Sequence, residues 1–213
     1  MNFVSWPVAM FAIASFSAGA AENIDAKPDV AKASQTATQI CAACHGADGN
    51  SASPVNPSIA GQPAQYITEQ LTNFKSGIRN NPVMASIAAT LSPEDMRALG
   101  IYFSQQKPKG QAAKDPALAL SGQKIYRGGN LSTGVPACAA CHLPDGVGIP
   151  PKYPRIGGQY AEYVYAQLKA FKAGERGMDK EDKDANGKVM AQIAAKMSER
   201  EMQAVAQYVS GLR

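Results

Sequence analysis

One sequence pattern occurs twice in this chain, and the repeat limits the possible folds more than any other feature. Shifting the 213-residue sequence by 97 positions places segment 57–62 on segment 154–159, and the likeness continues beyond it. After nine further residues in the second copy, segment 84–89 meets segment 190–195. Two copies of one domain, each of about 100 residues and thus of ordinary domain size, are the simplest explanation.

Each copy contains a Cys-x-x-Cys-His motif, and the two motifs use every cysteine and histidine of the protein. Cysteines three positions apart at a helix start lie on one face, where they can form thioethers with two haem vinyl groups. The histidine that follows then reaches the iron. The sequence therefore predicts two covalently attached haem c groups. The residues that hold them would be Cys41, Cys44, His45, Cys138, Cys141 and His142.

Other uses of paired cysteines explain the motifs less well. Four cysteines in an exported protein ordinarily suggest two disulfides, and Cys-x-x-Cys pairs also occur in zinc sites and in thiol oxidoreductases. None of these explains a histidine directly after each pair. A thioredoxin-type enzyme would also need an order of strands and helices that this sequence lacks.

Methionine is the available sixth iron ligand, because no histidine remains. The repeat preserves two methionine pairs, Met84 with Met190 and Met96 with Met202. The second pair belongs to a helical stripe of apolar residues and is expected in the core. Met84 follows Pro82, so we expect its segment to cross the haem face as a loop. Met84 and Met190 are therefore the predicted ligands, and their thioethers would favour ferrous iron and a relatively high reduction potential.

The apolar spacing within each copy is helical rather than alternating, most clearly in segments 66–74 and 163–171. Segment 92–95 reads Ser-Pro-Glu-Asp, which is typical of a helix start with a capping serine and acids in the first turn. Strands are hard to place anywhere. We therefore predict an all-α protein.

The beginning of the chain predicts an export signal. Residues 1–21 contain no charged side chain and end in small residues after an apolar stretch. An uncleaved membrane anchor is the alternative, although Pro7 and several serines disfavour it. A polar, proline-containing connector separates the two copies. The expected plan is a signal peptide at 1–20, a first haem domain at 21–111 and a second at 112–213.

The charge of the protein is mildly positive and uneven. The formal net charge of +4 is too small to suggest a nucleic-acid partner. Residues 22–112 carry seven basic and seven acidic side chains, whereas residues 113–213 carry fourteen and ten. The surplus in the second half could orient docking on an acidic redox partner.

With these features the chain resembles the cytochrome c4 family, whose members are dihaem proteins of the class I cytochrome c superfamily. The matching elements are segments 41–50, 59–62 and 74–79 and the surroundings of Met84 and Met190. The resemblance implies two tandem class I cytochrome c domains related by pseudo-twofold symmetry. It also implies a periplasmic electron carrier, not an enzyme, that donates electrons to a membrane-bound terminal oxidase or another redox protein.

The resemblance implies roles for residues around each haem. The carbonyls of Pro57 and Pro154 should accept the ring N–H of the two motif histidines and fix both imidazoles. Arg79 and Arg176 occupy equivalent positions, where they either pair with haem propionates or lie exposed. In the second copy Leu143 replaces a glycine of the first motif, which puts the local loop path in doubt.

Two other functions remain as alternatives. The chain could be the dihaem cytochrome subunit of a flavoprotein dehydrogenase of the sulfide-oxidising type. A dihaem peroxidase would need an open iron and a distal acid or base, and the lack of spare histidines argues against it. Peripheral association with a membrane also stays open.

Overall fold

The computed structural model describes residue 1 and residues 27–178 and 184–213. The expected signal peptide, residues 1–20, lies outside the described residues apart from Met1. The first domain consists of α1(Val30–Thr36), the π-helical turn η1(Ala37–Cys41), α2(Ala42–His45), α3(Ala64–Ser76), α4(Pro82–Ala89) and α5(Pro93–Ser104). The second consists of α6(Pro116–Gly128), α7(Ala139–His142), α8(Ala161–Lys172), α9(Ala185–Ala194) and α10(Glu199–Gly211).

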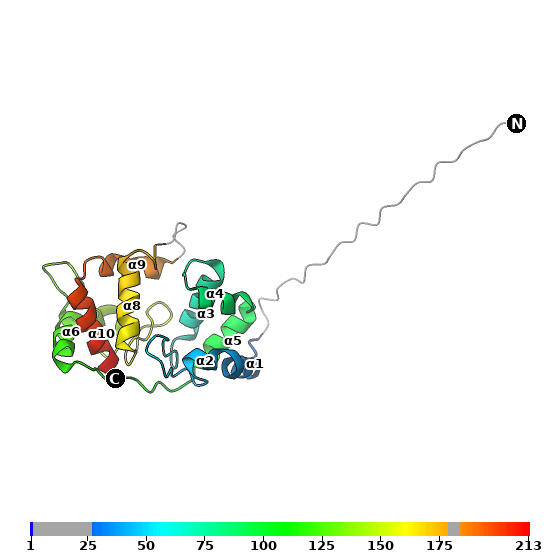
Figure 1. Cartoon of the computed structure of the whole chain (residues 1–213), viewed down its shortest axis with the longest axis horizontal. Coiled ribbons are helices and arrows are strands. Elements are labelled where there is room, and N and C mark those ends of the chain that lie inside the picture. The colour runs from blue at the N-terminus through cyan, green and yellow to red at the C-terminus, as the bar shows by residue number, and fades with distance from the viewer. Residues whose placement is uncertain (2–26, 179–183) are drawn as a thin grey trace.

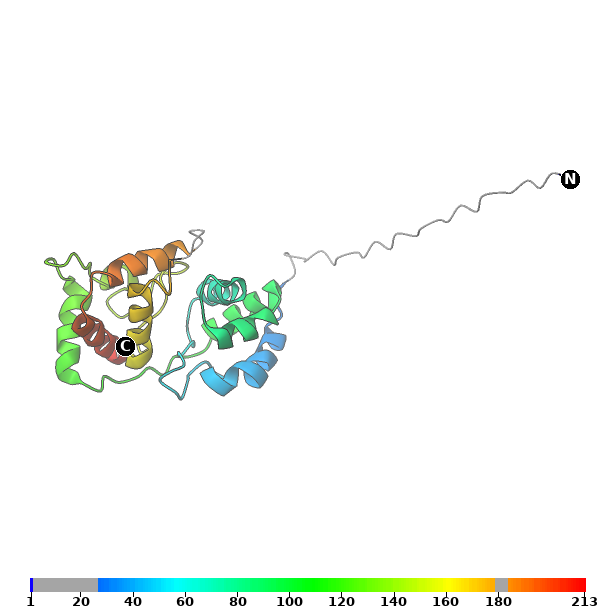
Figure 2. The same cartoon turned by 45° about the horizontal axis from the view of Figure 1, so that its top comes forward.

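The all-α prediction is confirmed. Two groups of helices stand side by side, with α1 to α5 in one and α6 to α10 in the other (Figures 1 and 2). In residues 27–178 and 184–213, β-type pairing is limited to single bridges between Asn130 and Val135 and between Ile149 and Tyr153.

The two domains pack their helices in the same way. In the first, α5 contacts α1 and α3, and α4 contacts α3; in the second, α10 contacts α6 and α8, and α9 contacts α8. Each domain has its own apolar core. Met96 is 3% exposed in the first core and Met202 is 1% exposed in the second, which confirms their predicted packing role.

The last helix of each domain starts with the same cap. The Ser92 hydroxyl accepts the Asp95 N–H while the Asp95 carboxylate accepts the Ser92 N–H. Ser198 and Glu201 repeat this exchange at α10. Each capping box satisfies two backbone donors that a helix start leaves free. The helix start and the capping serine at Ser92 were predicted from the sequence, and the reciprocal bond from the acid is a finding of the structure.

The expected loop around Met84 is wrong, because Met84 lies in the first turn of α4. Pro82 occupies the first helical position, where a missing N–H costs nothing. The Asn81 side chain accepts the Met84 N–H at 2.9 Å and caps the helix. Met190 likewise lies within α9. The proline therefore starts this helix instead of preventing it.

The connector between α5 and α6 is held against both domains. The Asn50 side chain accepts the Lys109 N–H at 2.8 Å and donates to the Lys107 carbonyl at 3.1 Å. At the other end, the Ser210 hydroxyl donates to the Ala112 carbonyl at 3.1 Å. These bonds define the path along which the connector runs past the bases of both helix groups (Figure 1).

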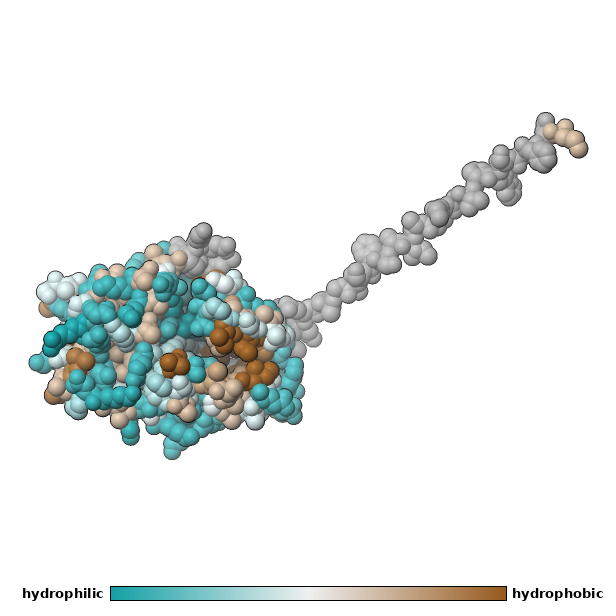
Figure 3. Space-filling view, in the orientation of Figure 1, coloured by the Kyte–Doolittle hydropathy of each residue, from teal (hydrophilic) through white to brown (hydrophobic). Residues whose placement is uncertain are grey.

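The surface in the view of Figure 3 is mostly hydrophilic, and its hydrophobic residues gather mainly on the side of the first domain. Among the described residues, none of the helices combines the length and the apolar character needed to cross a membrane.

The packing of α6 on α10 gives a test of the fold. A Cβ added at Gly122 would lie 1.9 Å from the Ala204 carbonyl oxygen, whereas one at Gly128 would meet no atom within 4 Å. We expect Gly122→Ala to lower the free energy of unfolding by about 1 to 3 kcal/mol through overpacking. Gly128→Ala, on the same helix, should leave it unchanged or raise it slightly. Denaturant titration of both variants measures this, and equal effects would contradict the close packing.

Candidate cofactor site

A cavity of about 960 Å³ lies between the two domains and contains both Cys-x-x-Cys-His motifs in its wall. The wall takes residues from both helix groups, including Phe74 and Leu99 from the first and Phe171 and Val205 from the second. All six residues predicted to hold haem line this cavity: Cys41, Cys44, His45, Cys138, Cys141 and His142. The structure therefore brings together the two motifs, which are far apart in the sequence.

The two motifs reach the cavity by different local structures. In the first domain α1, η1 and α2 follow one another without a break, so the motif lies at the end of one helical stretch. In the second domain a loop separates α6 from the short α7. Reciprocal backbone hydrogen bonds between Asn130 and Val135, at 2.8 and 3.0 Å, close this loop. The repeat alignment gave no sign of this difference.

Both motif histidines are oriented by a proline carbonyl, as expected. The Nδ1 of His45 lies 2.8 Å from the Pro57 oxygen, and the Nδ1 of His142 lies 3.0 Å from the Pro154 oxygen. With Nδ1–H donating to a carbonyl, Nε2 is left to bind a metal. Burial lowers the pKa of both histidines, although the carbonyl bonds oppose it. Each imidazole is thereby kept in the neutral form that an iron ligand needs.

The first cysteine of each motif has the opposite character to a redox-active thiol. Burial raises the pKa of Cys41, and it raises the pKa of Cys138 to about 11. Thiols that act in redox exchange have lowered pKa values, because the thiolate is the reactive form. None of the four cysteines is in a disulfide. The burial of Cys41 and Cys138 thus argues against thiol redox chemistry at these motifs.

The methionine pairs separate clearly. Met84 and Met190 are half-buried and line the cavity. Met96 and Met202 are buried in the apolar cores of the two domains and do not line the cavity. The pair predicted to ligate iron is therefore the pair that faces the cavity.

The substitution at Leu143 does not change the path of the chain. Gly46 ends the first motif with a φ of +75°, and Leu143 ends the second with a φ of +64°. A side chain at such a φ is uncommon and strained. The Leu143 carbonyl accepts the Tyr126 hydroxyl at 2.6 Å, which holds this turn in place.

Two glutamines hold the domains together through reciprocal backbone contacts. Gln62 of the first domain accepts the Arg155 N–H at 2.7 Å and donates to the Arg155 carbonyl at 2.9 Å. Gln159 of the second accepts the Ser58 N–H at 3.0 Å and donates to the Ser58 carbonyl at 2.8 Å. Ser58 and Arg155 are counterparts in the repeat, and so are Gln62 and Gln159. The same contact is therefore made twice, as a pseudo-twofold interface requires.

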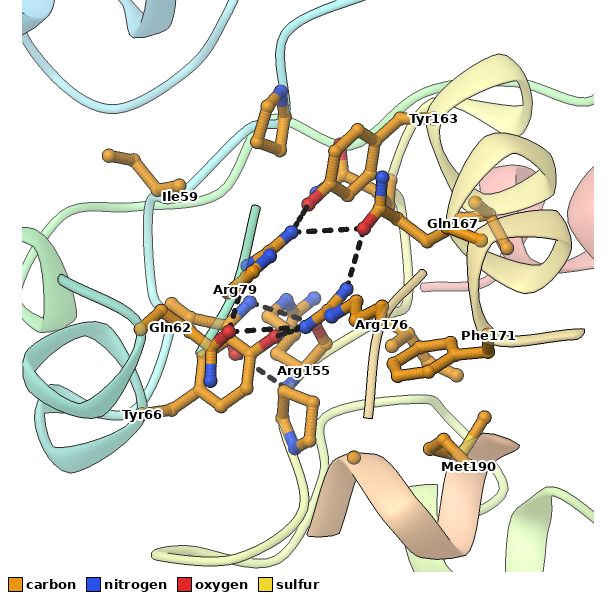
Figure 4. A pocket seen from close by; sticks show the side chains of 18 of the residues that line it. Ile59, Gln62, Tyr66, Arg79, Arg155, Tyr163, Gln167, Phe171, Arg176 and Met190 are labelled. Carbon is orange, nitrogen blue, oxygen red and sulfur yellow. Dashed lines mark hydrogen bonds between the residues drawn. The ribbon is translucent and has the colours of Figure 1, made fainter. Parts of the chain in front are cut away.

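Two buried arginines make a second reciprocal contact beside the glutamines (Figure 4). Arg79 donates to the Tyr163 hydroxyl at 2.9 Å and to the Gln167 side chain at 3.0 Å. Arg176 donates to the Tyr66 hydroxyl at 3.0 Å and to the Gln70 side chain at 3.2 Å. Each arginine therefore binds a tyrosine and a glutamine of the opposite domain.

Both guanidinium groups are also held within their own domains. Arg79 donates to Gln70 at 2.8 Å, and its Cζ lies 4.6 Å from the Phe74 ring centroid. Arg176 donates to Gln167 at 2.7 Å, and its Cζ lies 4.5 Å from the Phe171 centroid. Each arginine is 9% exposed, so the alternative that they lie on the surface is wrong.

The charges and hydroxyls of this cluster affect one another. Burial disfavours the phenolate of Tyr163, but Arg79 and Arg176 outweigh it and lower the pKa of Tyr163. Burial likewise disfavours the Arg79 cation, yet the tyrosines beside it, with Tyr163 foremost, hold the pKa of Arg79 above its usual range. Arg79 therefore stays charged in the interface.

Sequence reasoning missed that Tyr66, Gln70 and their counterparts Tyr163 and Gln167 form this interface. It placed them on helical stripes of otherwise apolar residues. The available signal was the repeated glutamine within each stripe, since a buried amide needs partners that a helix core does not offer.

The cavity also contains donors that suit a haem. Two residues of its wall, Arg155 and Arg176, each have a buried Nε without a hydrogen-bond partner among the described residues. Buried donors are nearly always satisfied, so unpaired guanidinium nitrogens beside an apolar cavity fit an anionic group on an apolar ligand. A haem, with an apolar ring and two propionates, has this character.

Comparison with known proteins identifies the family. Models of "Cytochrome c" and of "Cytochrome C oxidase, cbb3-type, subunit III" match residues 119–213 and 28–103. Cytochrome c4 of Pseudomonas aeruginosa is 40% identical over 85% of this chain and 88% of its own length. The chain belongs to the cytochrome c4 family. With both Cys-x-x-Cys-His motifs present, this membership means two covalent haem c groups and an electron-carrier role.

Other members and relatives agree in fold and length. The crystal structure of reduced cytochrome c4 from Pseudomonas stutzeri is 37% identical, with a TM-score of 0.79, covering 88% of this chain and all of that one. A protein of Thiomonas intermedia named thiosulfate dehydrogenase electron acceptor is 39% identical over 80% of this chain and 77% of its own length. The cytochrome c4 fold thus accounts for both domains of this chain.

The reciprocal cluster predicts matched effects in the two domains. Tyr66→Phe and Tyr163→Phe each remove a hydroxyl that accepts from a buried arginine, so each should lower the free energy of unfolding by about 1 to 3 kcal/mol. Tyr102→Phe is the control, because its hydroxyl bonds the Ala47 carbonyl within the first domain at an exposed site. Calorimetry of the haem-loaded protein measures the effects. If Tyr66→Phe and Tyr163→Phe lower the free energy of unfolding no more than Tyr102→Phe does, the cluster has no stabilising role.

Proposed function

We propose that this protein carries electrons in the periplasm, with His45 and Met84 as ligands of the first haem iron and His142 and Met190 as ligands of the second. The observation that carries the proposal is that these two histidine–methionine sets line one cavity while Met96 and Met202 lie in the cores. Cys41 and Cys44 would attach the first haem, and Cys138 and Cys141 the second.

In this proposal the iron of each bound haem supplies a one-electron couple, and thioether ligation favours its ferrous state. The chain supplies orientation and surroundings. The Pro57 and Pro154 carbonyls fix the imidazoles, and the apolar walls restrict water at both irons. The arginine and glutamine contacts hold the domains, and so the two sites, in one arrangement. Because the chain would supply both a histidine and a methionine to each iron, no substrate would need access to it, so we propose a carrier without a catalytic site of its own.

We propose that the mature protein begins after residue 20 and consists of domains at 21–111 and 112–213. An exported dihaem protein would work in the periplasm. The acceptor we favour is a membrane-bound terminal oxidase, approached by free diffusion or along the membrane surface. The basic surplus in residues 113–213 makes the second domain the better candidate for an acidic partner.

A second candidate partner lies on the input side. The likeness to a protein named thiosulfate dehydrogenase electron acceptor supports a role in which this chain takes electrons from a dehydrogenase. A flavoprotein dehydrogenase of the sulfide-oxidising type belongs to the same class of partner. The two roles are compatible, because a carrier needs both a donor and an acceptor.

The iron ligands can be tested directly. Met84→Ala and Met190→Ala should each remove one methionine-to-iron absorption band and lower the reduction potential of one haem, because a soft ligand of ferrous iron is lost. Met96→Ala and Met202→Ala are the matched controls. They should keep both bands and lower the free energy of unfolding by about 2 to 5 kcal/mol. Spectra with redox titration measure this, and intact axial ligation in both cavity variants would refute the assignment.

The partner can be tested by kinetics. The reduced protein should be oxidised by membranes that contain a terminal oxidase, and the rate should fall as salt rises because exposed charges guide the encounter. Stopped-flow oxidation at several ionic strengths measures this. In parallel, thiosulfate dehydrogenase and a flavoprotein sulfide dehydrogenase are offered as electron donors. If a dehydrogenase reduces the protein rapidly but oxidase membranes do not oxidise it, the second candidate partner replaces the oxidase in the proposal.

A further inference from the structure

The two halves of the glutamine contact differ in one side chain. Gln159 bonds the backbone N–H and carbonyl of Ser58, and Gln62 makes the equivalent two hydrogen bonds to the backbone of Arg155. Ser58 and Arg155 are repeat counterparts, and both line the cavity. The second domain therefore has a guanidinium where the first has a neutral hydroxyl. By contrast, Arg79 and Arg176 place one guanidinium in each domain.

Arg155 lies in the wall of the second haem site. It directly follows Pro154, whose carbonyl lies 3.0 Å from Nδ1 of His142. Its backbone is occupied by Gln62, but its side-chain Nε is buried without a hydrogen-bond partner among the described residues. The close-up shows the residue in the same pocket as Arg176 (Figure 4). Arg155 as a whole is half-buried, but its enclosed Nε–H has no protein acceptor and so fits an anion in the cavity.

We propose that Arg155 binds a propionate of the second haem and thereby raises the reduction potential of that haem. The inference rests on the proposed function, because it takes His142 as a ligand of the second haem. It adds a positioning and tuning residue that the first domain lacks.

The sign follows from Coulomb's law. Reduction adds one negative charge to the haem, and a nearby cation stabilises that charge more strongly in a buried site than in water. Pairing the propionate with a guanidinium also removes the effect of a negative charge close to the iron. Ser58 supplies neither effect in the first domain.

The position of Arg155 depends on the opposite domain. Gln62 belongs to the first domain, so domain docking holds the second haem's arginine in place. Gln62→Ala should therefore shift the potential of the second haem although the changed residue lies in the first domain. Gln159→Ala removes the equivalent interdomain contact from Ser58 and keeps the bonds between Gln62 and Arg155, so it is the matched control for weakened docking.

The decisive test uses the full chain with both haems and Arg155→Ser, which installs the residue of the first copy. The variant should fold, because the bonds from residue 155 to Gln62 come from its backbone. We expect the potential of the second haem to fall while that of the first stays in place. The equilibrium constant for moving an electron from the first haem to the second should drop about tenfold, or about 59 mV for one electron. Haem-resolved redox titration by NMR measures both values.

Two further variants complete the test. Ser58→Arg should raise the potential of the first haem, and Lys124→Ser, at an exposed site on α6, removes one charge without a shift of either haem. An unchanged second haem in Arg155→Ser, or a shift confined to the first, would overturn the proposal. The methionine-to-iron bands report separately on the proposed function: their absence in the unmodified protein would refute the ligand assignment, whereas intact bands with unshifted potentials would refute only the role of Arg155.

Discussion

Buried guanidinium groups need hydrogen bonds and nearby negative or polar atoms, and the arrangement of this protein depends on how Arg79 and Arg176 obtain them. Neither arginine is completed by its own domain. Each takes one glutamine from its own domain and a tyrosine and a glutamine from the opposite domain. Separating the domains would leave two cations with part of their partners, which is costly for buried charges. The interface therefore holds the two motif-bearing walls around one cavity.

Duplication gives the interface its symmetry and also a place for asymmetry. Because each domain offers the same arginine, tyrosine and glutamines, one set of contacts is made twice. At positions 58 and 155 the opposite glutamine bonds only the backbone, so these contacts do not depend on which side chain is present. A serine in one copy and an arginine in the other leave the docking unchanged while altering the charge beside one haem site. Direction in electron transfer can thus arise within an otherwise symmetric pair.

Much of the site could be predicted because the determinants are local. The spacing of Cys41, Cys44 and His45 already specifies attachment, and the helix start at Ser92 follows from capping chemistry within four residues. The interpretation failed at Met84, where Pro82 was taken to prevent a helix. A proline is compatible with the first helical turn, and whether it starts or interrupts a helix depends on the capping side chain before it, here Asn81.

The sequence by itself determined the two-domain plan, the helical class, the haem motifs and the two methionine pairs, because each depends on spacing within a short segment or on the repeat. Only the tertiary structure decided that Met84 and Met190 face the cavity, that Arg79 and Arg176 are buried, and that Arg155 has a free buried donor. These properties depend on contacts between residues about 100 positions apart, and spacing along the chain carries no information on which surfaces meet.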